Sequence, residues 1–501
     1  MKRTMVGVLP GMVAVLLMSV GVSGQTNGFV LQCLSARTSG QGCVTRGQGD
    51  APTSLFRDPA GLVSVAERSL ELNAAPFMPA LTFRNGANAE AVDGRNHTYP
   101  MASFAYVGPK IGKLAWAVGM EPIGGFGSDF QLRHDLLSGG QGRLIDYESF
   151  FAAAKFGPAV AYELFPGFSV GGSVSGVYAL IRDFRMPFSM SPSAARGMAG
   201  IPQLDPAVYG PLFQQFTELT AYGDSKGYDG LTWTADAGIA YRSPSGFAFS
   251  ASWSPERAIE VDGGSAVIDM SAQFDAMLGA MVAARMQAYG TSQSFSRSVV
   301  LQQLAAAGLD LQAGMTANYQ AATTITLPMT VGAGASLPLG GAVRLAGELE
   351  WRRWSEAEDV MPFELTAGDN QNINIMMNGD GANGDFTYPF PLHWQDALSA
   401  KLGATWSLAG GHALRAGFMY GENPVPDHTV FITFPAISTR AVTFGGTLNV
   451  GRLPLDVSFV RALEQDLAGC SDGHAIGSEY LNSRTTMSEN VVTVGTVLRF
   501  R

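Results

Sequence analysis

Residues 25–62 read Q-T-N-G-F-V-L-Q-C-L-S-A-R-T-S-G-Q-G-C-V-T-R-G-Q-G-D-A-P-T-S-L-F-R-D-P-A-G-L. This segment contains too much Gly and Ser for a stable strand, and it lacks the 3.6-residue periodicity of an amphipathic helix. Residues 63–501 consist largely of segments in which apolar and polar residues alternate as in β-strands. An irregular, mildly apolar segment before a long run of strands predicts a plug around which a β-barrel closes.

The composition restricts the class of protein. The chain has 501 residues with 61 glycines, and 15% of its residues are charged. Beyond the N-terminus no span reaches the roughly 18–20 apolar residues of a transmembrane helix. Two classes remain: a large soluble β protein, and a transmembrane β-barrel whose lipid-facing residues alternate along each strand. The net charge of -10 disfavours a nucleic-acid partner, which would need clustered Lys and Arg.

The N-terminus has the pattern of a secretory signal peptide, which we place at residues 1–24. Lys2 and Arg3 are followed by an uncharged, mostly apolar stretch over residues 5–22, and Val22-Ser23-Gly24 offers small residues for cleavage. The alternative is a membrane anchor, which Pro10 and the glycines of this stretch disfavour.

Export places the chain in an oxidising compartment, where Cys33 and Cys43 could form a disulfide within the plug. Their spacing permits this bond without proving it, and Cys470 is then left as a free thiol. The chain has no Cys-x-x-Cys pair, and its six histidines show no metal-binding spacing. We therefore expect neither a metal site nor a cofactor.

Fourteen segments have the character of strands, and an even number suits a closed antiparallel barrel. The sequence thus predicts an all-β fold, a 14-stranded antiparallel transmembrane β-barrel over residues 69–501 with an N-terminal hatch, residues 25–68, inside it. The predicted strands are residues 69–84, 97–107, 113–120, 149–165, 168–184, 231–241, 247–259, 323–337, 342–354, 395–408, 412–420, 440–450, 454–463 and 490–500.

Alternation within the strands predicts an outer and an inner face. In residues 343–352 the apolar side chains of Val343, Leu345, Leu349 and Trp351 point one way, and the charged side chains point the other way. The charged set is Arg344, Glu348, Glu350 and Arg352. In a soluble sandwich this charged face would meet bulk water, whereas in an outer-membrane barrel it would line the lumen.

The connections alternate between long and short, as in an outer-membrane barrel with long external loops and short periplasmic turns. The long connections cover residues 124–147, 187–230, 262–322, 355–391, 421–439 and 464–489. The second and third contain apolar stripes at helical spacing, which predict helical extracellular loops. These stripes either pack the loops into a cap or form an apolar groove for flexible ligands. Their members include Phe213, Phe216, Met270, Phe274, Met277 and Met281.

Three groups of motifs resemble the FadL/TodX family of outer-membrane transporters. The first is G-F-V-L-Q followed by R-G-Q-G-D-A and F-R-D-P-A-G-L, in residues 28–62. The second is I-T-L-P-M-T-V-G-A-G followed by E-L-E-W-R-R-W-S, in residues 325–355. The third is H-W-Q-D-A-L-S-A-K-L-G-A-T-W followed by L-R-A-G-F-M-Y-G-E-N-P-V-P-D, in residues 393–427. Asp58 stands where the family has Asn, the Cys pair is unusual for the family, and the chain ends in Arg501.

The resemblance implies a 14-stranded barrel with an internal hatch that carries long-chain fatty acids or aromatic hydrocarbons from an external groove to an interior pocket. It also implies a kink in the third strand that opens the wall sideways. Pro122, Gly124, Gly125 and Gly127 lie late in that strand. We interpret this cluster as the start of the next loop, with a weakened wall as the alternative.

The hatch supplies the expected gate. Phe29, Leu31 and Phe56 are expected pocket walls, Asp58 and Pro59 would fix the end of the hatch, and Gly124 and Gly125 would allow gating. A carboxylate ligand would need a cation. Candidates on the predicted inner face are Arg344, Arg352 and Arg415, although an ion-pair network with Glu348 and Glu350 is the interpretation that we favour.

No catalytic constellation is present, so we expect a transporter and not an enzyme. The predicted function is passive, gated transport of hydrophobic small molecules, long-chain fatty acids first, across the outer membrane. The alternative is a structural or adhesive surface barrel that binds through its loops. Expected partners are the hydrophobic substrate and the lipids of the outer membrane, without nucleic acid, and we expect a monomer.

Overall fold

The structure is a computed structural model that describes residues 26–48, 51–95, 97–138, 143–191, 202–378, 381–451 and 453–500. The predicted signal peptide, residues 1–24, lies outside these residues. Within the described part of the chain, no helix has both the length and the apolar character needed to cross a membrane.

One antiparallel sheet closes on itself, because the last strand, β21 (Arg484–Arg499), pairs with the first wall strand, β3 (Ser69–Arg84). The wall has 14 strands, which confirms the predicted fold. Four of them consist of two segments each: β10 (Ala248–Ser254) with β11 (Arg257–Asp269), β12 (Thr316–Leu327) with β13 (Met329–Leu339), β14 (Val343–Arg353) with β15 (Val360–Thr366), and β16 (Phe386–Pro391) with β17 (Ala397–Ser407). The others are β5 (Tyr99–Val107), β6 (Leu114–Leu132), β7 (Ile145–Phe165), β8 (Phe168–Met190), β9 (Leu219–Arg242), β18 (Ala413–Gly421), β19 (Arg440–Val450) and β20 (Leu453–Ala468).

Strand β14 shows the predicted division into two faces. Leu345 and Leu349 are 43% and 56% exposed, whereas Glu348 and Glu350 are buried in the barrel. Apolar side chains on the outside and charged ones on the inside are the pattern of a barrel that meets lipid. The predicted inner face is therefore confirmed.

The four two-part strands are interrupted next to one another in the wall. Pro255 and Pro328 stand at two of the breaks, where a residue without an N–H group cannot continue the ladder. The short helix α7 (Trp354–Ala357) and residues 392–396 form the other two. Trp354 and Trp394 come from these last breaks, and both are buried. The breaks therefore supply two large aromatic side chains to the interior.

The prediction that the third wall strand ends before Gly124 is wrong. Strand β6 continues to Leu132, and its register with β7 shifts between Pro122 and Gly124. Its pairing with β5 ends at Met120, beyond which residues 120–130 are buried on both faces. A bulge at a residue without an N–H group bends the strand inward. The Pro–Gly cluster is thus a kink in the wall and not the beginning of a loop.

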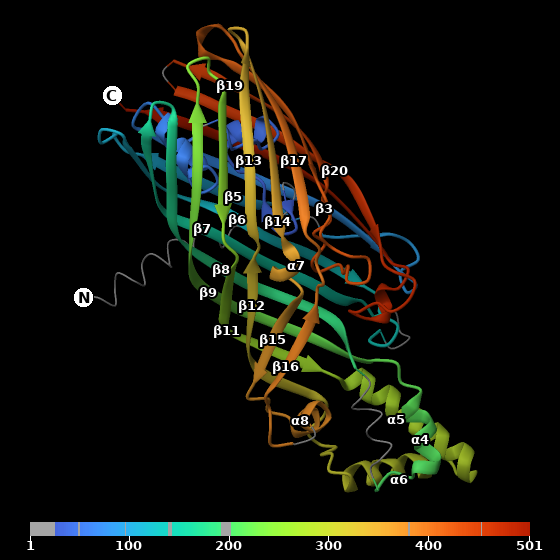
Figure 1. The fold of residues 1–501 in the computed structure, drawn as a ribbon. Coiled ribbons are helices and arrows are strands. Elements are labelled where there is room, and N and C mark those ends of the chain that lie inside the picture. The colour runs from blue at the N-terminus through green and yellow to red at the C-terminus, as the bar shows by residue number, and fades with distance from the viewer. Residues whose placement is uncertain are drawn as a thin grey trace.

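The long loops are shorter than predicted because β8, β9 and β11 extend further than their patterns indicated. The connections cover residues 191–218 and 270–315 in place of residues 187–230 and 262–322. They carry α4 (Pro206–Gln214), α5 (Ser271–Tyr289) and α6 (Gln293–Ala306), which lie together beyond the end of the barrel (Figure 1). A fourth helix, α8 (Gln371–Asn378), lies in the connection between β15 and β16.

The hatch fills the part of the barrel nearer the short turns. It consists of β1 (Thr26–Asn27), β2 (Val30–Leu31), α2 (Ala36–Gly40) and two turns of 3-10 helix, η1 (Pro52–Phe56) and η2 (Pro59–Ser64). A disulfide joins Cys33 and Cys43, and both residues are buried. The loop between them is therefore a covalent ring enclosed by the wall.

This disulfide loop is seated against three glycines of the wall. A Cβ atom at Gly417 would overlap the backbone nitrogen of Gly42, and one at Gly403 would overlap the carbonyl oxygen of Gln41. At Gly445 a Cβ atom would lie 2.9 Å from the Cα atom of Gly40. These glycines let the hatch approach the backbone of the wall.

We expect Gly417→Val to displace the hatch, since the added side chain would occupy the position of the disulfide loop. Overpacking of this kind lowers stability by about 1–3 kcal/mol. Thermal unfolding in detergent should fall to a lower temperature, and ion conductance in planar bilayers should rise. Gly347→Val is the matched control, because its Cβ atom would lie 3.4 Å from the nearest atom, an ordinary contact. Equal behaviour of the two variants would contradict the seating.

Candidate functional site

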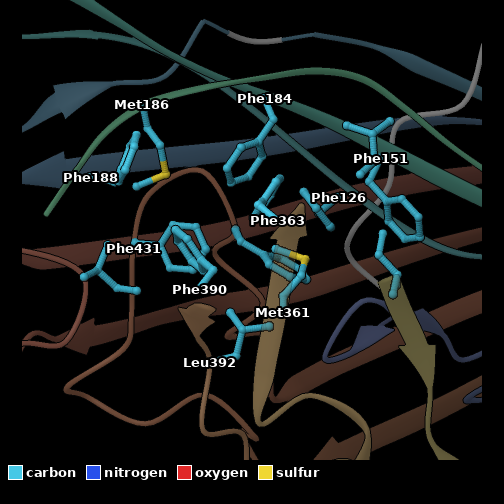
Figure 2. Packing of buried hydrophobic residues seen from close by; sticks show 14 of the residues in the cluster. Phe126, Phe151, Phe184, Met186, Phe188, Met361, Phe363, Phe390, Leu392 and Phe431 are labelled. Carbon is cyan, nitrogen blue, oxygen red and sulfur yellow. The ribbon is translucent and has the colours of Figure 1, made fainter. Parts of the chain in front are cut away.

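An apolar chamber lies inside the barrel toward the long loops. Figure 2 shows side chains from several wall strands that point toward one another in this region. The ring centroids of Phe184 and Phe363 are 5.4 Å apart, and those of Phe363 and Phe390 are 6.1 Å apart. About 440 Å³ between the lining side chains is not filled by protein atoms, and part of this space is open to solvent. The lining residues are Phe184, Met186, Phe188, Gly223, Asp224, Ser225, Tyr228, Ala266, Ile268, Phe363, Leu365, Tyr388 and Phe390.

The chamber suits an apolar ligand. Asp224 is the one charged residue among the described residues that line it, and its carboxylate accepts a hydrogen bond from Arg185 Nε at 3.1 Å. Each CH₂ group that a ligand buries contributes about 0.8 kcal/mol. A ligand in the chamber would therefore be held by apolar contact, since no cation is among the lining residues.

Phe29 of the hatch lies next to this apolar region. Its ring centroid is 5.0 Å from that of Trp354 and 5.5 Å from that of Phe151. Asn27 Oδ1 accepts a hydrogen bond of 3.0 Å from Trp354 Nε1. Gly28, which lies between Asn27 and Phe29 in the chain, has a φ of 59°. A Cβ atom at Gly28 would lie 2.5 Å from Trp354, so only glycine fits this turn.

The same hatch segment is joined to the kink in β6. Val30 pairs with Gly124, and the N–H group of Gly125 donates a hydrogen bond of 3.0 Å to the carbonyl oxygen of Phe29. A Cβ atom at Gly124 would lie 2.8 Å from this oxygen. The hatch therefore closes the inner side of the kink through its backbone.

A buried ion-pair network fixes the hatch to the wall. Arg46 Nη1 lies 2.8 Å from Glu348 Oε1 and 2.6 Å from Glu350 Oε2. Lys401 Nζ lies 2.9 Å from Glu348, and Arg352 pairs with Glu350. The backbone N–H of Arg46 also donates to Glu348 at 2.8 Å. Although burial opposes its charge, Glu350 and Glu348 hold the pKa of Arg46 above its ordinary value.

Asp58 fixes the end of the hatch. Its Oδ1 accepts a hydrogen bond of 3.1 Å from the N–H of Gly61 and so caps η2, which begins at Pro59. Burial raises the pKa of Asp58 from 3.8 to about 6, against the opposing effects of the Ser250 hydroxyl, Arg46 and the Gly61 N–H.

A family profile described as "Outer membrane protein transport protein (OMPP1/FadL/TodX)" matches residues 17–500. The chain belongs to this family. No curated protein sequence matches it significantly.

Solved structures of FadL/TodX proteins share the fold. A FadL homologue of Pseudomonas aeruginosa aligns with a TM-score of 0.66 and 14% identity, over 95% of this chain and 100% of that one. The toluene transporter TodX of Pseudomonas putida aligns with a TM-score of 0.67 and 14% identity, over 95% of this chain and 100% of that one. The toluene transporter TbuX of Ralstonia pickettii aligns with a TM-score of 0.60 and 14% identity, over 94% of this chain and 99% of that one. At this identity the likeness shows the fold alone.

Membership of the FadL/TodX family places the barrel in the outer membrane as a multi-pass protein. The short turns then face the periplasm and the long loops face the exterior. The chamber lies in the external half of the barrel, and the hatch lies on its periplasmic side.

The predicted pocket walls in the hatch lie in three separate clusters. Phe29 packs in the large cluster around the chamber. Leu31 packs with the disulfide and with Met101, Met120 and Phe150. Phe56 packs with the wall near the periplasmic turns. The structure therefore places Phe29 in the cluster that extends to the chamber, although Phe29 does not line the chamber itself, and it places Leu31 and Phe56 in two other clusters.

The predicted groove residues divide between a cap and its junction with the barrel. Phe213, Met277 and Met281 are buried in the core shared by α4, α5 and α6. Phe216 and Phe274 contact both this core and the large cluster around the chamber, and Met270 is buried in that large cluster. Of the two interpretations, the packed cap describes the first three residues, whereas the other three join the cap to the barrel and do not line the chamber.

The predicted cations lie apart from the chamber. Arg344 Nη1 donates a hydrogen bond of 3.0 Å to Ser336 Oγ, and Arg415 Nη1 lies 3.6 Å from Asp456 Oδ1. The third candidate, Arg352, pairs with Glu350 in the ion-pair network that we favoured from the sequence. The partner of this network from the hatch, Arg46, had no signal in the sequence. Among the described residues, no group of three or more His, Cys, Asp and Glu could hold a metal ion.

The connection between β18 and β19 was predicted to be an external loop, but more than half of it turns into the barrel. Residues 429–438 are all buried inside the barrel and pack in the large apolar cluster. The run V-F-I-T-F-P-A-I over residues 430–437 is a signal for this, because an exposed loop rarely carries so many apolar residues.

We expect Arg46→Ala to lower stability by about 3–5 kcal/mol, because it leaves two buried carboxylates without their hatch partner. Chemical unfolding of the detergent-solubilised protein measures this loss. Arg353→Ala is the control, since Arg353 is 36% exposed and 3.4 Å from Glu256. An exposed pair of this kind contributes at most about 1 kcal/mol. Similar losses in the two variants would contradict the proposed anchorage.

Protonation of Asp58 should strengthen the fold. Because the folded pKa of about 6 exceeds the unfolded value of 3.8, the folded state binds the proton more tightly, and stability falls as pH rises through this window. Asp58→Asn should remove this contribution, which amounts to about 3 kcal/mol. The measurement is the difference in unfolding free energy between wild type and variant at several pH values. A difference that does not change with pH would refute it.

Proposed function

We propose that the protein is a passive, gated channel that admits hydrophobic small molecules through the outer membrane. The observation that carries this proposal is the apolar chamber, whose aromatic and aliphatic lining is enclosed by the wall (Figure 2). Movement of an apolar solute down its gradient requires no covalent step, so we propose a channel and not an enzyme. It requires a dry surface and a gate that opens on binding.

We propose that substrate leaves the barrel sideways at the kink in β6. The ladder between β5 and β6 includes Phe104↔Met120 and does not continue beyond it, although both strands do. Tyr99 and Phe150 lie across this unpaired edge with ring centroids 6.1 Å apart. The N–H of Arg95 donates a hydrogen bond of 2.8 Å to the carbonyl oxygen of Asp129 further along β6. Between Met120 and Asp129, an apolar solute that passes the hatch strand would thus meet an edge closed by side chains.

The alternative path, straight through the hatch to the periplasm, crosses a charged layer. This layer contains the Arg46 network and Lys155, whose Nζ lies 2.6 Å from Asp236 Oδ2. Ion pairs that an apolar solute separates or desolvates are costly to disrupt. The layer therefore supports lateral exit over periplasmic exit.

The first substrate candidate is the long-chain fatty acid that the sequence led us to expect. Its acyl chain would match the apolar lining of the chamber, but its carboxylate would find Asp224 and no lining cation. The aromatic lining supports a second candidate, neutral aromatic hydrocarbons, and two structural relatives are described as toluene transporters. We propose that neutral compounds enter the chamber whole, whereas fatty acids keep their carboxyl group outside it.

Filling the chamber tests the proposal. Ala266 is buried and lines the chamber, so Ala266→Phe should reduce uptake of radiolabelled toluene and of a long-chain fatty acid several-fold. Ala258→Phe on the same strand is the control, because Ala258 is exposed on the outside. Uptake is measured in cells that express equal amounts of folded barrel. If cells with the wild-type protein take up neither compound faster than cells without it, the proposed function is wrong.

A further inference from the structure

The inner loop, as we call residues 429–438, occupies the lumen between the chamber and the hatch. All ten of these residues are buried, and none belongs to a strand or helix. Nothing in the barrel fold requires this connection to turn inward, since the loops that carry α4, α5 and α6 extend beyond the wall (Figure 1). Its apolar side chains account for its position.

Side-chain contacts hold the inner loop in place. Ser149 Oγ donates a hydrogen bond of 2.5 Å to the carbonyl oxygen of Thr433, and Thr433 Oγ1 lies 3.0 Å from Met186 Sδ. Thr429 Oγ1 donates a hydrogen bond of 2.6 Å to the carbonyl oxygen of Leu392. A segment held without a β-ladder can move at a lower free-energy cost than the strands around it.

Two rings of the inner loop complete a row of aromatic side chains that leads from the chamber to the kink. The ring centroid of Phe390, in the chamber, is 4.9 Å from that of Phe431, which lies beside it in Figure 2. The ring centroids of Phe431 and Phe434 are 6.1 Å apart. Phe434 stacks on Phe126 of the kinked strand with a centroid separation of 3.7 Å.

The row continues to the hatch without interruption. The ring centroid of Phe151 is 5.1 Å from that of Phe126 and 5.5 Å from that of Phe29. Phe434 also lies 5.0 Å from Trp394. A solute that moves from the chamber toward the kink must therefore take the space that Phe431 and Phe434 occupy.

We propose that the inner loop is a gate, and that Phe434 occupies a ring-sized binding site that a transported molecule takes when this gate opens. The proposal rests on the proposed function of the channel. A hydrophobic ligand restores the contacts that Trp394 and Phe126 lose when Phe434 leaves, so the exchange costs little apolar burial. Binding to the open form is what shifts the loop toward that form.

The first test is the rate of uptake. Phe434→Ala removes the ring that closes the row, so we expect toluene uptake to rise several-fold and to depend less on the size of the hydrocarbon. Phe83→Ala is the matched control: Phe83 is equally buried, but its ring contacts Tyr480 and lies outside the row. Phe434→Leu keeps an apolar side chain of smaller size and should give an intermediate rate if Phe434→Ala folds poorly.

The second test detects the movement itself. A Phe434→Cys variant in a Cys470→Ser background carries one free thiol, since Cys33 and Cys43 are joined. Without ligand the thiol should resist a membrane-impermeant maleimide, and added toluene should raise its labelling rate several-fold. Phe83→Cys in the same background should show no such increase.

The outcomes separate this proposal from the proposed function. One outcome refutes the gate and leaves the proposed channel intact. In it, the wild type takes up toluene, Phe434→Ala and Phe434→Leu take it up at the wild-type rate, and toluene does not change the labelling rate of Phe434→Cys. If the wild type takes up no hydrophobic compound, the channel is refuted, and the gate with it. Faster uptake in the variants together with ligand-dependent labelling supports both.

Discussion

The buried contact between Arg46 of the hatch and two glutamates of β14 is the constraint on which the closed barrel depends. Taking charges out of water is costly, and the network is stable only because each carboxylate meets more than one cation, and Glu348 also meets backbone N–H groups. Glu348 accepts hydrogen bonds from the backbone of Thr45 and Arg46 and also pairs with Lys401. The hatch therefore cannot shift by a small amount, since a partial movement would leave charges buried and unpaired.

This fixed hatch gives the kink in β6 its shape. A wall strand that bends inward loses its pairing with β5 and leaves backbone groups to be satisfied. The hatch supplies one partner, because the carbonyl oxygen of Phe29 accepts the N–H of Gly125. Gly124 allows this approach, since a side chain there would meet the same carbonyl group. The opening in the wall is thus stabilised by the plug that blocks it.

Local patterns predicted the wall and the hatch segment but not the contacts between them or the other segment that fills the lumen. The two-residue period of β14 identified its inner face, since alternation depends only on neighbouring residues. Pro122 and its glycines are typical of a turn, and only the distant hatch makes them a kink within a strand. Arg46 and Glu348 are 302 residues apart, so no spacing rule links them. The apolar composition of residues 429–438 is a signal that this segment is buried. It does not show which elements inside the barrel the segment contacts.

The hatch strand and the inner loop meet the same segment of β6 and also meet each other, since the ring centroids of Phe29 and Phe434 are 5.9 Å apart. Phe126 stacks on Phe434, and Phe151 lies between Phe126 and Phe29. Displacement of either element removes a packing partner from this segment, so the second displacement breaks contacts that the first has already weakened. Two movements that share partners in this way favour each other, which is a coupling free energy between the external chamber and the periplasmic plug. A hydrophobic molecule in the row replaces the lost contacts and so favours both movements, while an empty passage favours neither.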